Sequence, residues 1–429
     1  MKRLVLVAYH VPPQIGIASE RAASLLRWLP RLGWSVSLVT PHVPFFPIEG
    51  ASSGSPVEGV ERIGVASPEL GRWLHRRRAV PADAPQPGPQ GAATSWARRF
   101  VREWVYVPDS RVAWIPFAAR AVRSLLAAAD PQHTVVLSTS VPYSAHFAAM
   151  IGIRGGRFPW VAEFRDPWSE AHPFLRPRSA GRRLIDDRLH RMVLARANRV
   201  VVTSQSTLEG LRRSYGVAEG RIAVVQNGYE PTPPGTPPGP HEPCVFLYGG
   251  SVAPGERVEP LLEGLAAAQR CVDVPLRLRV RGPREPWASA CRALELPSSL
   301  VELPGSTSAH EARAEMAHAS ANLLVNAHPA YAAVLPGKAF EYLGVRRPIV
   351  AALRPGSELE VLLTDYARPL LVDGASGSAW STAFVEVARR HRAGTLQTPV
   401  DERRPLAALS REWQMGSLAT LLDEVLAGP

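Results

Sequence analysis

Lysine is almost absent from this chain of 429 residues. Lys2 and Lys338 are the two lysines among 49 basic residues, so nearly all of the positive charge is carried by arginine. The net charge of +11 therefore reflects a preference for arginine, and it is weak evidence for nucleic-acid binding. The densest basic runs, at 76–78 and 176–183, are short and lack interleaved aromatics. We interpret them as solvated loops, with an anionic membrane surface or an acidic partner as the alternative.

Cysteine is also scarce. Cys244, Cys271 and Cys291 are odd in number and show no C-x-x-C spacing, which argues against a disulfide framework and a zinc site. No apolar run approaches the roughly 20 residues that span a bilayer. The apolar stretch at 4–8 is too short for the core of a signal peptide. We therefore expect a cytoplasmic protein, with peripheral membrane contact as an option.

Two common nucleotide-binding signatures are missing. Segment 250–256 has the glycine spacing of a P-loop, but Glu256 stands where a P-loop requires lysine, which disfavours ATP hydrolysis. The fingerprint G-x-G-x-x-G follows no expected strand, which disfavours NAD. The glycine turn still leads through Arg257 into a helix, and backbone N–H groups at a helix N-terminus can hold a diphosphate. The alternative is an ordinary strand-to-helix turn.

The length and composition predict a folded protein of two or three domains, with 46% apolar and 20% charged residues. Six prolines between 231 and 240 exclude a helix or a central strand there and indicate a linker. We expect an N-terminal domain at 1–230 with a flexible loop at about 79–95, a second domain at 241–395, and a tail with a closing helix at 396–429.

Short β-branched runs alternate with helical patterns in both halves. Strands are expected at 4–8, 36–40, 134–137, 160–164, 199–203, 222–225, 245–248, 276–280, 321–325 and 348–351. Helices are expected at 18–32, 258–268, 309–317, 338–345 and 407–426. This alternation predicts two doubly wound parallel α/β domains, whose ligands bind at the carboxyl ends of the strands.

The most informative segment is 334–350. Pro336-Gly337 turns the chain and Lys338 opens a helix, with Glu341 one turn later on the same face. This spacing directs a cation for phosphate and a carboxylate for ribose hydroxyls toward one ligand. The alternative is a surface ion pair worth a few tenths of a kcal/mol. In a chain that prefers arginine, a retained lysine favours a compact point charge that arginine cannot supply.

The stretch Pro-Gly-Lys-x-Phe-Glu-Tyr-Leu at 336–343, followed by Arg-Pro-Ile, resembles the nucleotide-sugar motif of the retaining glycosyltransferases of family 4, which have the GT-B fold. Further segments resemble that family in the same order along nearly the whole chain: 10–16 with 20–21, 138–146, 161–168, 224–228, 248–251, and 304–305 with Glu311. The resemblance implies two Rossmann-like domains facing an interdomain cleft. It also implies a nucleoside-diphosphate sugar, such as a UDP-sugar, on the C-terminal domain and an acceptor on the N-terminal domain.

The resemblance also implies roles for single residues. Lys338 and Arg257 match the cations that hold the diphosphate, and Glu341 matches the second carboxylate of the E-x7-E motif, on the ribose. Donor-binding glycines are expected at Gly16, Gly249, Gly250, Gly305 and Gly337. Two positions depart from the family: Ala333 replaces the first carboxylate of E-x7-E, and Arg165-Asp166 follows the strand that often ends at a catalytic histidine.

Glycosyl transfer passes through an oxocarbenium-like transition state while negative charge grows on the leaving diphosphate. No Asp-x-Asp metal motif occurs in the chain. We therefore expect Lys338, Arg257 and backbone N–H groups to stabilise that charge without a metal or another cofactor. Retention of the anomeric configuration rests on the resemblance alone.

Candidates for handling the acceptor lie near strand ends of the first half. Glu163 and Asp166 are candidates for orienting or deprotonating the acceptor hydroxyl, with Arg165 between them. The alternative is that Arg165 and Asp166 pin a loop through salt bridges. His10, His146 and Trp168 are further acceptor-side candidates, although histidines and tryptophans in such places are commonly structural.

Two other functions remain open at this stage. One is a nucleotide-sugar epimerase or hydrolase on the same fold, since a fold does not fix a function. The other is a non-catalytic relative that supports a partner transferase, suggested by Ala333. The acceptor stays open among small molecules, lipid-linked glycans and polysaccharides, and no nucleic-acid partner is expected.

Overall fold

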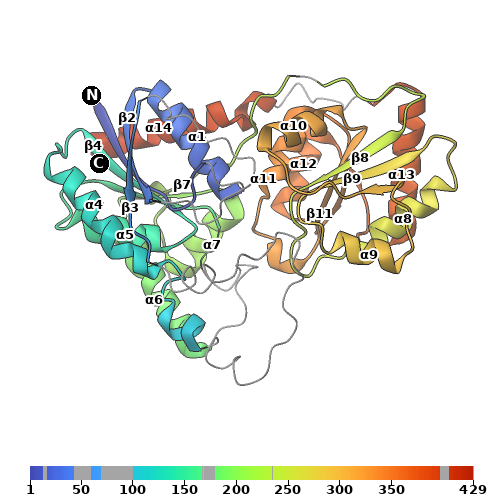
Figure 1. Ribbon diagram of the computed structural model, residues 1–429. Helices are drawn as coiled ribbons and strands as arrows, with labels where there is room; N and C mark the ends of the chain where they lie inside the picture. The colour runs from blue at the N-terminus through green and yellow to red at the C-terminus, as the bar shows by residue number, and fades with distance from the viewer. Residues whose placement is uncertain are drawn as a thin grey trace. The chain divides into compact units, whose positions relative to one another are not determined.

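A computed structural model describes residues 1–12, 17–42, 59–68, 100–166, 168, 179–233, 235–396 and 405–428. The chain divides into two compact units (Figure 1): Met1–Val225 with Met415–Pro429, and Gln226–Gln414. The proline-rich segment 231–240 belongs to the second unit, and the end of the chain returns to the first. The loop expected at about 79–95 lies outside the described residues.

In its described part the first unit is built on a seven-stranded parallel sheet of order β3-β2-β1-β4-β5-β6-β7. Its strands are β1 (Lys2–Val7), β2 (Trp34–Pro41), β3 (Val60–Val65), β4 (Thr134–Ser140), β5 (Trp160–Phe164), β6 (Arg199–Val202) and β7 (Ile222–Val224). Leu4 of β1 pairs with Val36 and with Val135. Residues 4–7 are fully buried because helices cover both faces of the central strands.

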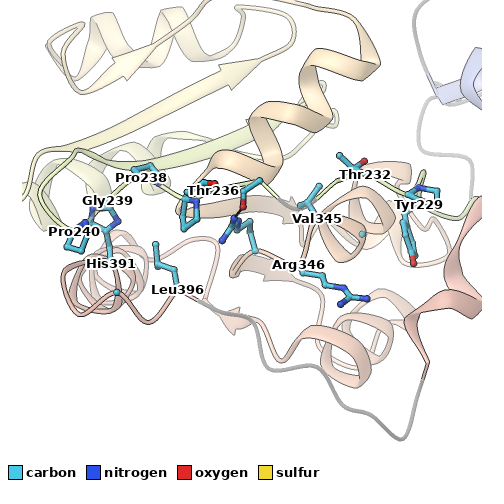
Figure 2. Close-up of a pocket in the computed structure, with 16 residues that line it drawn as sticks. Tyr229, Thr232, Thr236, Pro238, Gly239, Pro240, Val345, Arg346, His391 and Leu396 are labelled. Atoms are coloured by element: carbon cyan, nitrogen blue, oxygen red, sulfur yellow. Dashed lines mark hydrogen bonds between the residues drawn. The ribbon is translucent and has the colours of Figure 1, made fainter.

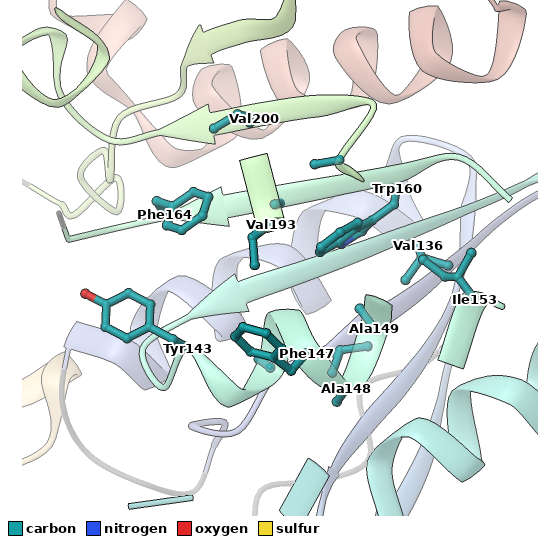
Figure 3. Close-up of a cluster of buried hydrophobic side chains, with 14 of the residues drawn as sticks. Val136, Tyr143, Phe147, Ala148, Ala149, Ile153, Trp160, Phe164, Val193 and Val200 are labelled. Atoms are coloured by element: carbon teal, nitrogen blue, oxygen red, sulfur yellow. The ribbon is translucent and has the colours of Figure 1, made fainter. Parts of the chain in front are cut away.

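Alternate residues of β1 pack on different layers of helices. Val5 and Val7 join the core formed with α4 (Ile115–Ala127), α5 (Ser144–Ile153), α6 (Ala180–Arg196) and α7 (Gln205–Tyr215), part of which is drawn in Figure 3. Leu4 and Leu6 join the core formed with α1 (Ile17–Arg31) and the C-terminal helix α14 (Arg411–Ala427). The end of the chain is therefore part of the first unit's core.

The second unit is built on a six-stranded parallel sheet, counted over its described residues, of order β10-β9-β8-β11-β12-β13. Its strands are β8 (Cys244–Gly249), β9 (Leu276–Arg281), β10 (Val301–Glu302), β11 (Ala321–Asn326), β12 (Ile349–Leu353) and β13 (Leu370–Leu371). One face is covered by α8 (Glu259–Gln269), α9 (Trp287–Ala293) and α13 (Gly377–Arg392). The other is covered by α10 (Ala309–His318), α11 (Gly337–Val345) and α12 (Glu358–Ala367).

Two doubly wound parallel α/β units confirm the predicted fold class. The expected helix at 18–32 is α1, and Gly33 follows it with φ of +86°, as a helix-stop glycine does. Three strands were missed: β3, β10 and β13. All three lie at sheet edges, and the sequence of β3, Val-Glu-Arg-Ile-Gly-Val, is only partly buried.

Short helical turns connect these elements: η1 (Val101–Val105), η2 (Val112–Trp114), η3 (Glu219–Arg221), η4 (Pro329–Tyr331) and η5 (Leu406–Leu409). Within the part of the chain that the structure describes, no helix has both the length and the apolar character to cross a membrane.

Candidate functional site

Strand β8 of the second unit ends in a tight glycine turn. Gly250 has φ of +88°, a conformation that favours glycine, and its N–H donates to the Arg281 carbonyl at 2.7 Å. A Cβ on Gly249 would lie 2.8 Å from Met316 Cε. Gly250 therefore requires glycine for its backbone conformation, whereas at Gly249 the end of the Met316 side chain would have to shift. Both lie at the carboxyl edge of the sheet, where ligands of such folds bind.

Lys338 lies at the start of α11, beside the end of β8. Pro336 precedes the helix as its N-cap and Gly337 is its first residue. The Lys338 Nζ donates a hydrogen bond to Tyr248 Oη at 2.8 Å and lies 4.0 Å from the centre of that ring. Burial lowers the pKa of Lys338 to about 7, and the nearby Glu256 opposes this shift. The lysine is thus held by a neutral partner rather than by a carboxylate bond.

Two tyrosines that the sequence analysis missed organise this turn. Tyr342 Oη accepts a hydrogen bond from Gly249 N at 2.9 Å, and Tyr248 Oη donates to the Ser251 carbonyl at 3.2 Å. Both rings are fully buried, and burial raises the pKa of each phenol, so both stay protonated at neutral pH. A local signal in the sequence could have pointed to both tyrosines, because Tyr248 directly precedes Gly249 and Tyr342 directly follows Glu341.

Glu341 stands in a cluster of charges within the second unit. Its Oε1 pairs with Arg411 Nη2 at 2.5 Å and with Arg313 Nη1 at 3.7 Å. Its Oε2 accepts from the Glu230 N–H at 3.4 Å, and Arg411 also lies 3.6 Å from the Glu230 carboxylate. Arg313 and Arg411 were not anticipated from sequence, since they come from α10 and from the start of α14. A ribose at Glu341 would share the carboxylate with these arginines.

Arg257 lies in a different setting from Lys338. Its side chain is 75% exposed and lies 3.6 Å from Glu259. Together with Glu256 it lines a cavity of about 630 Å³ next to the ends of β11, β12 and β13. Glu256 accepts a hydrogen bond from His328 N at 2.7 Å. The predicted donor-binding Gly305 follows β10 with φ of +93° and open space around it.

A larger cavity of about 750 Å³ lies at the other edge of the same sheet (Figure 2). It is lined by the proline-rich segment, which precedes β8, and by Val345 to Arg347, which precede β12. Arg347 bonds the Ala317 carbonyl at 2.7 Å, and His391 bonds the Glu242 carbonyl at 3.0 Å. Because strands of a parallel sheet begin together, this cavity is at the amino edge, away from the β8 turn.

Glu163 of the first unit is engaged inside the core. Arg21 pairs with its Oε1 at 2.6 Å, and the Thr139 hydroxyl donates to its Oε2 at 2.6 Å. The side chain is 0% exposed. Burial alone would raise the pKa of Glu163, but Arg21 and Thr139 hold it below the ordinary value. The carboxylate serves a buried ion pair, which favours a structural role, and a direct role of Glu163 toward an acceptor stays a prediction.

Arg165 and Asp166 follow β5 and are half-buried. Arg165 Nε donates to the Ser140 carbonyl, and the Thr203 hydroxyl donates to the Arg165 carbonyl at 2.7 Å. Burial lowers the pKa of Arg165, and the charge of Asp166 opposes that shift. These bonds favour the loop-pinning interpretation of Arg165, while Asp166 keeps its place at the carboxyl end of the strand.

The acceptor-side candidates differ in how deeply their side chains are buried. His146 is fully buried with Nδ1 2.8 Å from Ser138 Oγ, and burial lowers its pKa to about 3. Trp168 is 1% exposed and stacks on Tyr143 at 4.3 Å. Both are core residues, which favours a structural role, and their assignment as acceptor contacts stays a prediction. His10 is half-buried beside Tyr9. The predicted donor-binding Gly16 lies outside the described residues.

A known protein family and several solved structures resemble this chain. Residues 18–228 match the family described as glycosyl transferase 4-like domain. A search of curated protein sequences found no match. Among solved structures, a glycosyltransferase from Rickettsia africae ESF-5 is similar over 100% of both chains, with 11% identity and a TM-score of 0.57.

Two further structures are similar. S. aureus TarM, in complex with fondaparinux, α-GlcNAc-glycerol and UDP, matches 99% of this chain and 100% of its own, with 9% identity and a TM-score of 0.59. The lipopolysaccharide outer core galactosyltransferase WaaB matches 98% of this chain and 100% of its own, with 13% identity and a TM-score of 0.54. At sequence identities this low, the structures establish only that both units share the fold of these glycosyltransferases. The family match concerns the first unit.

Proposed function

Because residues 18–228 match a glycosyl transferase 4-like domain and the chain shares the fold of solved glycosyltransferases, we propose that it moves a sugar from a nucleoside-diphosphate sugar to an acceptor hydroxyl. The observation that carries the proposal is the position of Lys338 at the first turn of α11, beside the Gly249-Gly250 turn. A cation and a close-packed glycine turn at the carboxyl edge of a parallel sheet suit a diphosphate. UDP in the TarM structure supports this choice of ligand.

In the proposed reaction the bond between the sugar and the diphosphate breaks while the acceptor oxygen bonds to the anomeric carbon on the same face, and the hydroxyl proton passes to an oxygen of the leaving diphosphate. Lys338 and the N–H groups at the start of α11 stabilise the charge that grows on the leaving diphosphate. Glu341 holds the ribose, and Arg257 is a peripheral cation. Asp166 is the residue proposed to orient the acceptor hydroxyl.

We further propose that the reaction needs no metal and retains the anomeric configuration. The chain has no Asp-x-Asp motif, and Lys338 with backbone N–H groups supplies positive charge at the turn. Retention follows the family likeness. The proposed acceptor is a small molecule, a lipid-linked glycan or a polysaccharide. The proposed location is the cytosol, supported by free cysteines such as the exposed Cys271.

The two lysines allow a matched test of the donor site. Lys338→Met keeps the length of the side chain and removes its charge, and kcat/KM should fall roughly 10²–10³-fold while the melting temperature changes little. Lys2→Met is the control, since Lys2 pairs with Asp423 at 2.6 Å and is proposed to have no contact with the donor. It should retain wild-type kcat/KM. Activity is measured by mass spectrometry with a panel of nucleotide sugars and acceptors, with and without EDTA.

Two results would contradict the proposal. Nucleotide binding and transfer by Lys338→Met at the wild-type level would remove the donor site from α11. Conversion of a nucleotide sugar at full rate without any acceptor would indicate a hydrolase or an epimerase on the same fold.

A further inference from the structure

Tyr248 contacts Lys338 through both its hydroxyl and its ring, and the proposed function gives it no role. We infer that Tyr248 is a positioning residue, which orients the Lys338 ammonium toward the diphosphate of the donor. The inference rests on the proposed donor site. The new element is that a buried tyrosine of the neighbouring strand β8 determines the direction in which the Lys338 ammonium points.

The Tyr248 hydroxyl is fixed as a hydrogen-bond acceptor for the lysine. A phenol has one proton, and here the hydroxyl donates to the Ser251 carbonyl at 3.2 Å. Its remaining lone pairs then face the Lys338 Nζ at 2.8 Å. The direction of the first bond therefore determines how the ammonium is held.

The ring of Tyr248 is a rigid support. It is fully buried and packs against Trp287, with ring centres 4.9 Å apart. The Lys338 Nζ lies 4.0 Å from the ring centre, within range of a cation–π interaction. A flexible lysine that touches both the face and the hydroxyl of one fixed ring has few alternative positions.

The same tyrosine joins the lysine to the glycine turn. Tyr248 bonds the Ser251 carbonyl and Tyr342 bonds the Gly249 N–H, so both ends of the turn are tied to buried phenols. Lys338 is bonded to one of these phenols. A diphosphate that approaches this turn therefore meets an ammonium whose position is fixed by the same tyrosine.

The groups around Lys338 give the inference a measurable signature. Tyr248 faces it from β8, Glu256 acts on it from the loop before α8, and the Tyr342 phenol lies nearby on α11. Burial lowers the pKa of Lys338 to about 7 while Glu256 opposes the shift. The Tyr248 hydroxyl accepts a bond from the charged form, which favours that form. Loss of the hydroxyl should therefore lower the pKa of Lys338 further.

Tyr248→Phe keeps the ring and removes the acceptor. We expect KM for the donor to rise roughly tenfold with a smaller change in kcat, and the alkaline limb of the kcat/KM profile to move to lower pH. Tyr331→Phe is the matched control: the Tyr331 hydroxyl donates to the Pro254 carbonyl at 3.0 Å in the same loop. It should leave the alkaline limb in place.

The scarcity of lysine allows a direct measurement as well. Protein labelled with ¹⁵N-lysine has two side-chain signals, and Lys2→Met identifies that of Lys338. The Lys338 signal should titrate near pH 7 in the parent, at lower pH in Tyr248→Phe, and at higher pH when UDP is added. Identical titrations in the parent and in Tyr248→Phe would overturn the inference even where activity falls. If Tyr248→Phe does not fold, the mobility of the Lys338 ammonium in the labelled parent decides, and an ammonium as mobile as that of Lys2 overturns the inference.

The two proposals fail separately. If Lys338→Met loses UDP binding while Tyr248→Phe matches the parent in pH profile and titration, the donor site stands and the role of Tyr248 is refuted. If Lys338→Met binds UDP like the parent, the donor site itself is refuted.

Discussion

The charged residues around Glu163 in the first unit and around Lys338 in the second differ in the kind of partner they have. Glu163 is fully buried and paired with the opposite charge of Arg21. Lys338 is only half-buried and is bonded to a neutral tyrosine. A charge that is already neutralised by a buried partner stabilises the fold, whereas a charge held by a neutral partner can still neutralise an anion. For Glu163 and Lys338 the partner therefore distinguishes a structural charge from one that can bind an anion. Glu341, which Arg411 and Arg313 already neutralise, is proposed to accept hydrogen bonds from the neutral ribose instead.

The largest effect expected from this comparison is on Glu163. In Glu163→Ala the Arg21 guanidinium loses its buried counter-charge, so the free energy of unfolding of the first unit should fall by about 3–5 kcal/mol. Urea denaturation measures the change. Glu61→Ala is the control, because its side chain is 61% exposed and lies 3.7 Å from Arg3, and it should cost less than about 1 kcal/mol. A Glu163→Ala protein with normal stability and no transfer would place Glu163 in the active site.

Acid should lower the free energy of unfolding of the first unit. At Lys338 the expected loss is of kcat/KM, and it occurs at alkaline pH. Burial lowers the pKa of His190 to about 3, with Asp187 opposing, and burial lowers that of His146 to about 3. Both histidines titrate near 6.5 when unfolded, so between pH 6.5 and 3 the unfolded chain binds more protons. The free energy of unfolding should fall as pH drops from 6.5 toward 3, by about 1 kcal/mol per pH unit for each histidine.

His190→Phe tests this pH dependence cleanly. Both ring nitrogens of His190 are buried without a hydrogen-bond partner among the described residues, and the ring contacts Phe164 and Trp168. Phenylalanine should keep the stability at pH 7.5 and reduce the loss at pH 5.5, as measured by urea midpoints. His133→Gln, which replaces an exposed histidine, should leave most of the acid loss in place. An unchanged pH slope in His190→Phe would show that other groups cause it.

Most of the fold was readable from the sequence because its central strands are uninterrupted apolar runs, such as residues 4–8. The strands that were missed, β3, β10 and β13, lie at sheet edges, where burial imposes less of a pattern. The helix at Lys338 was predicted because its signals are adjacent in sequence: a Pro-Gly turn followed directly by a lysine.

The surroundings of the first unit's candidates could not be predicted from the sequence. The sequence places Glu163 near the end of a strand, but its partner Arg21 lies 142 positions earlier. Contacts between distant segments determine which strand ends carry buried ion pairs. A single sequence does not reveal those contacts. The burial of His146 and Trp168 was not predictable for the same reason, since it depends on their neighbours Ser138 and Tyr143.

The smallest effect is expected at Arg257, because solvent weakens the interactions of an exposed charge. Its side chain is 75% exposed and 3.6 Å from Glu259, so Arg257→Ala should change the free energy of unfolding by less than about 0.5 kcal/mol. Solvent and salt screen such a charge, so donor KM should rise only about two- to fivefold, and the difference should vanish at about 0.5 M salt. Arg270→Ala, at the exposed far end of α8, is the control and should leave KM unchanged. If Arg257→Ala were as damaging as Lys338→Met at high salt, then Arg257 would have to turn toward the donor when it binds. Exposure in the free protein would then fail as a criterion, and the contrast between the two units would rest on the partners of Glu163 and Lys338 alone.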